Sequence, residues 1–240
     1  MADWPAHLGR VILDSVDSTN LEAARRINTG DQWILAHSQT AGTGRRGKVW
    51  EMPKGNFAAS LLMHSAEDMQ ALAQRSFIAA LALHDTLEAF GATDISLKWP
   101  NDVLVRGRKI AGILLASAKG AIVIGIGVNL AKAPDIAKLE PTALPPIALK
   151  TVIASHVSAE DFLAVLATSF ERYEQQMRRF GFATIRTAWL QKATRLGEVI
   201  YARLPDGIET GTFETIDDTG ALVLITAKGR MVLPAAEVFF

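Results

Sequence analysis

Cysteine is absent from this sequence of 240 residues. Disulfide bonds, cysteine nucleophiles and zinc sites built on thiolates are therefore excluded, and a reducing compartment is compatible with the chain. An excess of charge of one sign is also lacking, because 25 Lys and Arg residues balance 25 Asp and Glu residues. This balance argues against attachment to nucleic acid or to a membrane through a general positive charge, and only a local basic patch could serve.

Long apolar segments are missing as well. The longest runs from Ala121 to Val128, whereas a helix needs about 18 apolar residues to span a bilayer. The first residues lack the basic segment followed by an apolar one that a secretory signal requires. We therefore expect a cytoplasmic protein that does not associate with membranes.

The composition that remains is typical of a packed protein, since 49% of the residues are hydrophobic and 21% are charged. Alternating and β-branched residues predict strands at 10–16, 33–38 and 56–63 and several short strands between 95 and 128. Apolar residues at helical spacing and capping residues predict helices from 19 to about 30, 66–90, 158–179 and 182–194. In the first helix we expect Thr19 as N-cap with Glu22 completing a capping box, and in the third we expect Ser158 with Asp161.

The short strands between 95 and 128 are separated only by turns at 100–102, 106–108 and 118–120. Strands with such short connections are antiparallel, because a parallel pair needs a crossover of about a dozen residues. The sequence therefore predicts an α+β protein with a mixed, largely antiparallel sheet covered by helices, and it excludes a doubly wound architecture. After Gly197 short strands with turn signals predict a small barrel, so we expect domains at 1–194 and 195–240.

The densest chemical signal is the segment from Gln39 to Trp50, which combines three glycines with Arg45, Arg46 and Lys48. Glycines let backbone N–H groups approach an anion, and the basic side chains add positive charge, so the segment predicts a cradle for a phosphate or carboxylate. A P-loop is disfavoured because Val49 stands where that motif has Ser or Thr and no helix can begin there. A solvated basic loop is the other alternative.

Three further segments can carry chemistry. Asn101 and Asp102 lie in a turn, where they are either ordinary turn residues or a ligand contact and a site for magnesium or another cation. Lys109 begins an apolar strand, where it either extends to solvent or holds a positive charge beside a reacting carboxylate and phosphate. Gly125 and Gly127 lack the dinucleotide fingerprint and are expected to clear space for a ligand ring, with Asn129 as a polar contact.

Five segments together resemble the biotin–protein ligases in their order and spacing: Ser18-Thr19-Asn20, 42–50, 98–102, 108–114 and 124–129. The resemblance implies a catalytic domain with the fold of class II aminoacyl-tRNA synthetases and biotin ligases, and residues 197–240 resemble the small SH3-like C-terminal domain of that family. It also implies two steps: biotin and ATP give biotinyl-5′-AMP, and a lysine of a biotin carboxyl carrier protein or domain then takes the biotinyl group. ATP and biotin would be substrates and Mg²⁺ a cofactor.

The resemblance also implies roles for individual residues. Lys109 and Arg45 would be catalytic, and Asp102 a ligand of magnesium. The residues implied to contact biotin, three of them through the backbone of 42–44, are Ser18, Thr19, Asn20, Gln39, Gly42, Thr43, Gly44, Arg45, Lys109, Gly112 and Gly127. Those implied to contact ATP or the adenylate are Arg45, Arg46, Lys48, Trp50, Asn101, Asp102, Lys109 and Asn129.

Members of the family that also repress transcription carry an N-terminal DNA-binding domain. About ten residues precede the first predicted strand here, so we expect a monofunctional ligase that binds no DNA. The sequence is also compatible with a homodimer. Two other functions are compatible with the sequence: a lipoate ligase or lipoyl/octanoyl transferase, which shares the fold, and a module that binds a ligand without catalysis.

Overall fold

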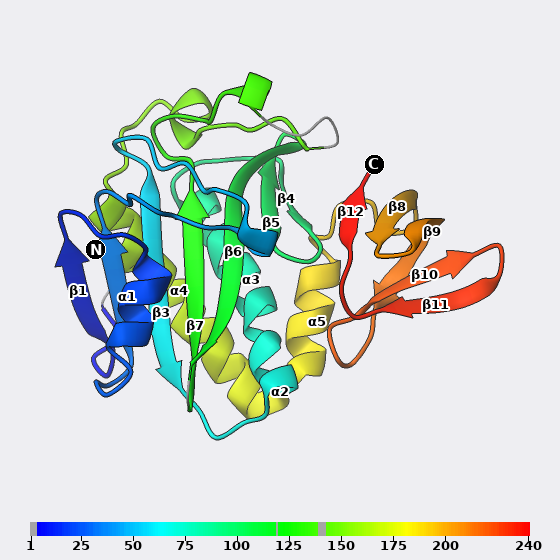
Figure 1. Cartoon of the computed structure of the whole chain (residues 1–240), viewed down its shortest axis with the longest axis horizontal. Coiled ribbons are helices and arrows are strands. Elements are labelled where there is room, and N and C mark those ends of the chain that lie inside the picture. The colour runs from blue at the N-terminus through cyan, green and yellow to red at the C-terminus, as the bar shows by residue number, and fades with distance from the viewer. Residues whose placement is uncertain (1–3, 119, 139–142) are drawn as a thin grey trace.

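The computed structural model describes residues 4–118, 120–138 and 143–240. Its larger sheet has seven strands in the order β1-β2-β3-β7-β6-β5-β4 (Figure 1). The strands are β1 (Gly9–Leu13), β2 (Gln32–Ala36), β3 (Phe57–His64), β4 (Ile95–Lys98), β5 (Asp102–Val105), β6 (Arg108–Ala118) and β7 (Ala121–Val128). Only β1 and β2 pair in parallel, across the intervening helix, and the other neighbours in this sheet are antiparallel. The predicted mixed, largely antiparallel sheet is therefore confirmed.

Helices cover both faces of this sheet: α1 (Thr19–Arg25), α2 (Met69–Ala73), α3 (Arg75–Ala89), α4 (Ala159–Phe180) and α5 (Phe182–Leu190). Figure 1 shows α3 and α4 behind the sheet and α1 in front of it. The main core lies between the sheet and α3, α4 and α5, and it includes Trp33, Phe57, Phe162 and Trp189. A smaller core lies under α1, where Ala23 packs among residues of β2, β3 and β7.

Three of the four predicted helices differ from those of the structure. The predicted helix at 66–90 is divided at Gln74 into α2 and α3, because α3 alone is enclosed by the sheet, α4 and α5. The predicted N-cap Thr19 is the first residue of α1, and Ser18 is the N-cap, with no hydrogen bond from its side chain. The Thr19 hydroxyl instead lies 3.1 Å from Gln39 Oε1. This tertiary contact replaces the predicted local cap, and α1 ends at Arg25, well before Gly30.

The second predicted capping box is confirmed, because Ser158 Oγ accepts a hydrogen bond of 3.0 Å from the Asp161 N–H at the start of α4. α4 ends at Phe180 and is followed by Gly181, whose φ of 76° is readily available only to glycine. The last predicted helix ends at Leu190, four residues early. No helix among the described residues combines the length and the apolar character needed to cross a bilayer.

The chain ends in a five-stranded antiparallel sheet of order β11-β10-β9-β8-β12, made of the short strands expected after Gly197. Its strands are β8 (Val199–Leu204), β9 (Gly207–Ile216), β10 (Leu222–Thr226), β11 (Gly229–Leu233) and β12 (Glu237–Phe239). The smaller sheet contacts the first through Trp99, whose Nε1 donates a hydrogen bond of 3.1 Å to the Gly220 carbonyl. β12 also lies near the turn that follows β4 (Figure 1), since Glu237 and Val238 line the same cavity as Asn101.

Candidate functional site

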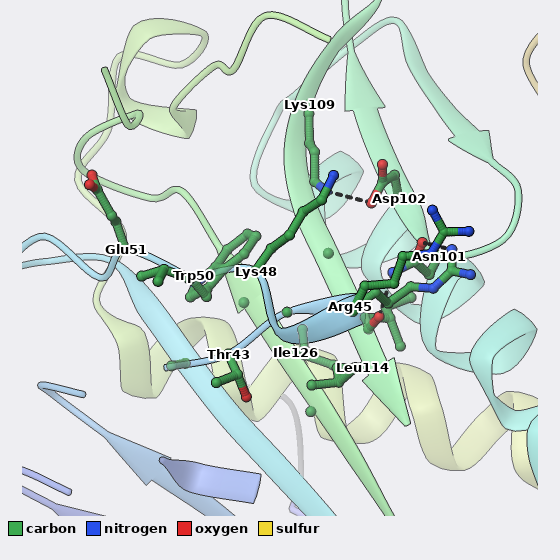
Figure 2. Close-up of a pocket in the computed structure, with 18 of the residues that line it drawn as sticks. Thr43, Arg45, Lys48, Trp50, Glu51, Asn101, Asp102, Lys109, Leu114 and Ile126 are labelled. Atoms are coloured by element: carbon green, nitrogen blue, oxygen red, sulfur yellow. Dashed lines mark hydrogen bonds and ion pairs between the residues drawn. The ribbon is translucent and has the colours of Figure 1, made fainter. Parts of the chain in front are cut away.

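A cavity of about 500 Å³ opens on the face of β5, β6 and β7 (Figure 2). Its wall combines the start of α1, the glycine-rich loop, the turn after β4, β6, β7 and β12. The lining residues that the sequence singled out are Ser18, Thr19, Asn20, Gln39, Thr43, Gly44, Arg45, Arg46, Lys48, Trp50, Asn101, Asp102, Lys109, Gly112, Gly127 and Asn129. Of the predicted site residues, only Gly42 lies just behind this wall, where its carbonyl accepts a hydrogen bond from the Trp50 N–H.

One end of the cavity has a floor of uncharged polar groups. The Thr19 N–H donates a hydrogen bond of 2.8 Å to Gln39 Oε1. Ser60 Oγ on β3 lies 2.8 Å from Thr19 Oγ1 and 2.6 Å from Asn20 Oδ1. The sequence analysis missed Ser60, although one polar residue within the apolar strand 57–63 was a signal. It is fully buried, and it holds the two side chains predicted to contact biotin.

Glycines on β6 and β7 leave space for the side chains of Asn20 and Trp50. A Cβ at Gly125 would lie 2.1 Å from Asn20 Oδ1, and one at Gly127 would lie 2.3 Å from Trp50 Cε2. At Gly112 the nearest atom would be Trp50 Cζ3, at 3.3 Å. The space at Gly127 that we expected to hold a ligand ring is occupied by the indole of Trp50 in this structure, and contact of Gly127 with a ligand stays a prediction.

The glycine-rich loop contains one short 3-10 turn at Arg45–Gly47 and then folds back on itself rather than leading into an α-helix. The Gly44 N–H donates to the Lys48 carbonyl at 2.7 Å, and Thr43 and Val49 form an isolated β-bridge. After Trp50 the chain continues to β3, so the geometry of a P-loop is absent from this described segment. Arg45 is turned toward the turn after β4, where its Nη1 donates a hydrogen bond of 3.3 Å to Asn101 Oδ1 (Figure 2).

The charged centre of the cavity is Asp102. Its Oδ1 lies 2.6 Å from Lys109 Nζ (Figure 2), and its Oδ2 lies 3.9 Å from Lys98 Nζ. Burial alone would raise the pKa of Asp102, but the charges of Lys109, Lys98 and Arg45 outweigh it and hold that pKa below its ordinary value. Lys109 therefore forms an ion pair in the cavity, and the alternative that it simply extends to solvent is wrong.

Two cations of the cavity are themselves desolvated. Burial lowers the pKa of Arg45, helped by the neighbouring Arg46. Burial also lowers the pKa of Lys98, against the attraction of Asp102. Lys98 belongs to the segment 98–102, but no role for it could be predicted from the sequence, because nothing local indicates that its side chain points into the cavity.

The last strand also reaches the site. Glu237 on β12 lines the cavity, and its carboxylate lies 3.0 Å from Arg46 Nη1 and 3.3 Å from Lys48 Nζ. Burial would raise the pKa of Glu237, but Lys48, Arg203 and Arg46 hold it below its ordinary value. The sequence analysis missed this residue, since it lies about 190 positions from the loop that it contacts.

Comparison with known proteins gives consistent matches. Residues 9–131 match the model of the biotin/lipoate A/B protein ligase family, and residues 196–240 match that of the biotin protein ligase C terminal domain. A biotin–[acetyl-CoA-carboxylase] ligase of Paracoccus denitrificans is 49% identical over 95% of this chain and 99% of its own length. A bifunctional ligase/repressor of Bacillus spizizenii is 29% identical over 95% of this chain and 71% of its own length.

Solved structures agree on the fold. The biotin protein ligase from Aquifex aeolicus, in complex with biotin and ATP, superimposes with a TM-score of 0.84 at 24% identity, and the match covers 96% of this chain and 97% of that one. The predicted fold class is thereby confirmed.

Proposed function

The chain belongs to the biotin/lipoate A/B protein ligase family, and from this premise we propose that it is a biotin–protein ligase that activates biotin with ATP and biotinylates a carrier domain. The observation that carries the proposal is the arrangement of one cavity. Its uncharged polar floor of Thr19, Asn20 and Gln39 adjoins a centre of positive charge around Lys109. Biotin has matching parts, an uncharged ureido ring and a carboxylate at the end of an aliphatic tail.

In the first step two anions approach each other, the biotin carboxylate and the α-phosphate of ATP. A carboxylate oxygen bonds to the α-phosphorus, and the bond from that phosphorus to the β-phosphate oxygen breaks, releasing pyrophosphate. Lys109 Nζ lies beside Gly112 and within 5.9 Å of the Trp50 ring, so it can contact both anions. Fixed cations at Lys109 and Arg45 stabilise the charge that develops on the phosphorus oxygens, because they need no reorganisation during the reaction.

The remaining predicted contacts keep their roles in this proposal. Ser18 and the backbone of Thr43 and Gly44 would border the biotin, with Gly42 behind them, while the adenylate would be bordered by Arg46, Lys48, Trp50, Asn101 and Asn129. Biotinyl-5′-AMP is a mixed anhydride that water would hydrolyse, so a loop that covers it protects it until the acceptor lysine arrives. In the second step the lysine amine attacks the biotinyl carbonyl, and AMP leaves.

Magnesium fits this site only together with ATP. Asp102 offers one carboxylate, and two ammonium groups already neighbour it. Magnesium sites of this kind use one or two carboxylates and take their other oxygens from substrate phosphates and water. Asp102 would then hold the ion, which would offset the negative charge of the phosphates.

Several further features belong to this proposal. The acceptor is a biotin carboxyl carrier protein or domain, such as that of acetyl-CoA carboxylase, in keeping with the name of the Paracoccus relative. The division into a catalytic domain at 1–194 and an SH3-like domain at 195–240 is supported by the separate second sheet and by the match of 196–240. Monofunctional activity without DNA binding and a cytoplasmic location remain predictions.

The test is pyrophosphate release with ATP and magnesium, run separately with biotin and with lipoate. A carrier domain is then added, and the mass of its lysine is measured. We expect release with biotin and a mass increase of one biotinyl group. Release with lipoate alone would assign the chain to the lipoate branch of the family, and a folded protein that is silent with both would be a binding module.

The variant Lys109→Ala tests the role of Lys109 in the first step. We expect pyrophosphate release to fall by about 10²–10³, the usual cost of losing one fixed contact to the transition state. Its circular dichroism should match that of the wild type and show an intact fold, although the buried Asp102 loses its partner at 2.6 Å. Normal release by this variant would remove Lys109 from the catalytic group.

A further inference from the structure

The segment 129–134, which follows β7, borders the cavity although it belongs to no helix or strand. Asn129 and Pro134 both line the cavity, and the proposed function places the adenylate beside Asn129. The beginning of the segment is fixed by its backbone. The Asn129 N–H donates a hydrogen bond of 2.9 Å to the Ile110 carbonyl, and the Asn129 carbonyl accepts one of 2.8 Å from the Leu149 N–H. The contacts of the following residues then decide where this wall of the cavity lies.

Asn56, the residue directly before β3, holds those following residues. Its Oδ1 accepts hydrogen bonds of 3.0 Å from the N–H groups of Ala131 and Lys132, and its Nδ2 donates one of 2.8 Å to the Lys132 carbonyl. Within the part of the chain that the structure describes, no other hydrogen bond reaches the backbone of Ala131 or Lys132. An amide can make all three bonds, because its oxygen accepts two and its nitrogen donates two. One side chain therefore fixes this part of the wall.

The core in turn fixes Asn56. Its neighbour Phe57 is fully buried and pairs with Val128 at the end of the β3–β7 ladder. Asn56 itself is only 2% exposed. A Cβ at Gly55 would lie 2.9 Å from the Cβ of Ala131, so the two chain segments also pass in close contact. Beyond the end of the ladder, the amide of Asn56 thus replaces the pairing that the two backbones no longer make.

We infer that Asn56 is a positioning residue, which fixes the segment 129–134 as the wall against which the nucleotide binds. This inference rests on the proposed function. Asn56 does not line the cavity, so it acts only through the segment that it holds. The biotin end is separate, because Ser60, which contacts Thr19 and Asn20, lies four residues farther along the chain. That separation is about 13 Å at the rise of a strand.

The physical effect of Asn56 is preorganisation. A wall that is loose in the free protein must become ordered when ATP binds, and the free energy of ordering then reduces the affinity. The three hydrogen bonds of Asn56 order the segment 129–134 when the protein folds, before ATP arrives. Loss of these bonds should therefore weaken the binding of ATP and leave the binding of biotin unchanged.

The experiment compares two substitutions of similar size. Asn56→Leu removes all three hydrogen bonds, whereas Asn56→Asp keeps an oxygen for the two N–H groups and loses the bond to the Lys132 carbonyl. The KM for ATP and kcat are measured from pyrophosphate release at saturating biotin, and the Kd of biotin is measured by calorimetry without ATP. Asn28→Leu, at an exposed position, is the control.

We expect the KM for ATP of Asn56→Leu to rise about tenfold, since one hydrogen bond is commonly worth about two- to tenfold. The KM of Asn56→Asp should lie between those of Asn56→Leu and the wild type, because two of the three bonds remain. The Kd of biotin and kcat should stay close to the wild-type values in both variants. Asn28→Leu should match the wild type in every measurement.

Proteolysis reports the position of the segment without reliance on the proposed function. Trypsin cleaves after lysine, and Lys132 is exposed and followed by Ala133. Cleavage between these two residues therefore measures how readily the segment leaves Asn56. We expect cleavage to be about fivefold or more faster in Asn56→Leu than in the wild type, because local opening requires fewer hydrogen bonds to break. Asn28→Leu should be cleaved there at the wild-type rate.

Each outcome decides the inference. An unchanged KM for ATP overturns it, and so does unchanged cleavage after Lys132. Equal losses of affinity for ATP and for biotin also overturn it, because they indicate general damage to the fold. If Asn56→Leu does not fold, Asn56→Asp is measured in its place and must change both the KM for ATP and the cleavage in the same direction. A wild-type protein that releases no pyrophosphate with biotin would instead refute the proposed function, on which the inference depends.

Discussion

Arg46 Nη1 donates a hydrogen bond of 3.0 Å to Glu237 Oε2, and this contact joins the glycine-rich loop to the last strand of the chain. Lys48 Nζ lies 3.3 Å from the other carboxylate oxygen of Glu237. The smaller sheet thus helps to hold the loop over the cavity, in which Glu237 and Val238 also take part. This relationship gives the smaller sheet a role in the site beyond packing.

Glu237→Gln removes the charge from this network and keeps its shape. Partly exposed ion pairs contribute about 0–1 kcal/mol each, so we expect the adenylate to dissociate about two- to fivefold faster. Measurement of biotinyl-5′-AMP dissociation at low and at high salt tests this, because salt should reduce the difference. An unchanged dissociation rate at low salt would show that the loop closes independently of the smaller sheet.

Gly125→Ala tests the polar floor. The new Cβ would lie 2.1 Å from Asn20 Oδ1, so Asn20 must move and lose its hydrogen bond to Ser60. A buried polar group left unpaired costs about 1–3 kcal/mol, and we expect the dissociation constant of biotin to rise by about tenfold or more. Calorimetric titration measures it. Gly30→Ala, where nothing lies within 4 Å of the added Cβ, is the control, and equal affinities in the two variants would contradict the role of Asn20.

The helical layer depends on a buried ion pair between α3 and α4. Arg75 Nη2 lies 3.0 Å from Glu174 Oε1, and the two side chains are 4% and 2% exposed. Glu174→Ala leaves the guanidinium with the exposed Glu67 as its remaining carboxylate partner. Removing one partner of a buried pair commonly costs 3–5 kcal/mol, and we expect a loss of about 3 kcal/mol because Glu67 remains. Urea unfolding measures it, with Gln175→Ala as the control, and a loss below about 1 kcal/mol would contradict this prediction.

The segment that leads into α1 should show a dependence on pH. Hydrogen bonds from Arg25 and from the Ser18 N–H lower the pKa of Asp17 from 3.8 to about 2. Because the folded pKa lies below the unfolded one, the stabilisation is complete above about pH 4 and is lost as the pH falls toward about 2. The difference in unfolding free energy between the wild type and Asp17→Asn should therefore shrink over this range. A difference that stays constant would show that the charge of Asp17 contributes nothing to it.

Much of the fold and of the site could be predicted because the signals are local. Short turns force antiparallel pairing of β4 to β7, and the cluster of glycines with Arg45, Arg46 and Lys48 indicates an anion site whatever surrounds it. Ser60, Lys98 and Glu237 could not be assigned in the same way. Their side chains reach the cavity through contacts between distant segments, and those contacts depend on the packed structure.

The sequence by itself determined the kinds of elements, their order and the chemistry available in the loop and turns, since periodicity, turn residues and charge are properties of neighbouring positions. Only the tertiary structure decided how that chemistry is combined. The Thr19 hydroxyl contacts Gln39 instead of capping the helix, and the Trp50 ring packs against Gly127. Lys98 and Lys109 both lie near the carboxylate of Asp102. The physical reason is that burial selects a partner for each polar group from whatever the fold brings within hydrogen-bond or ion-pair distance, irrespective of separation along the chain.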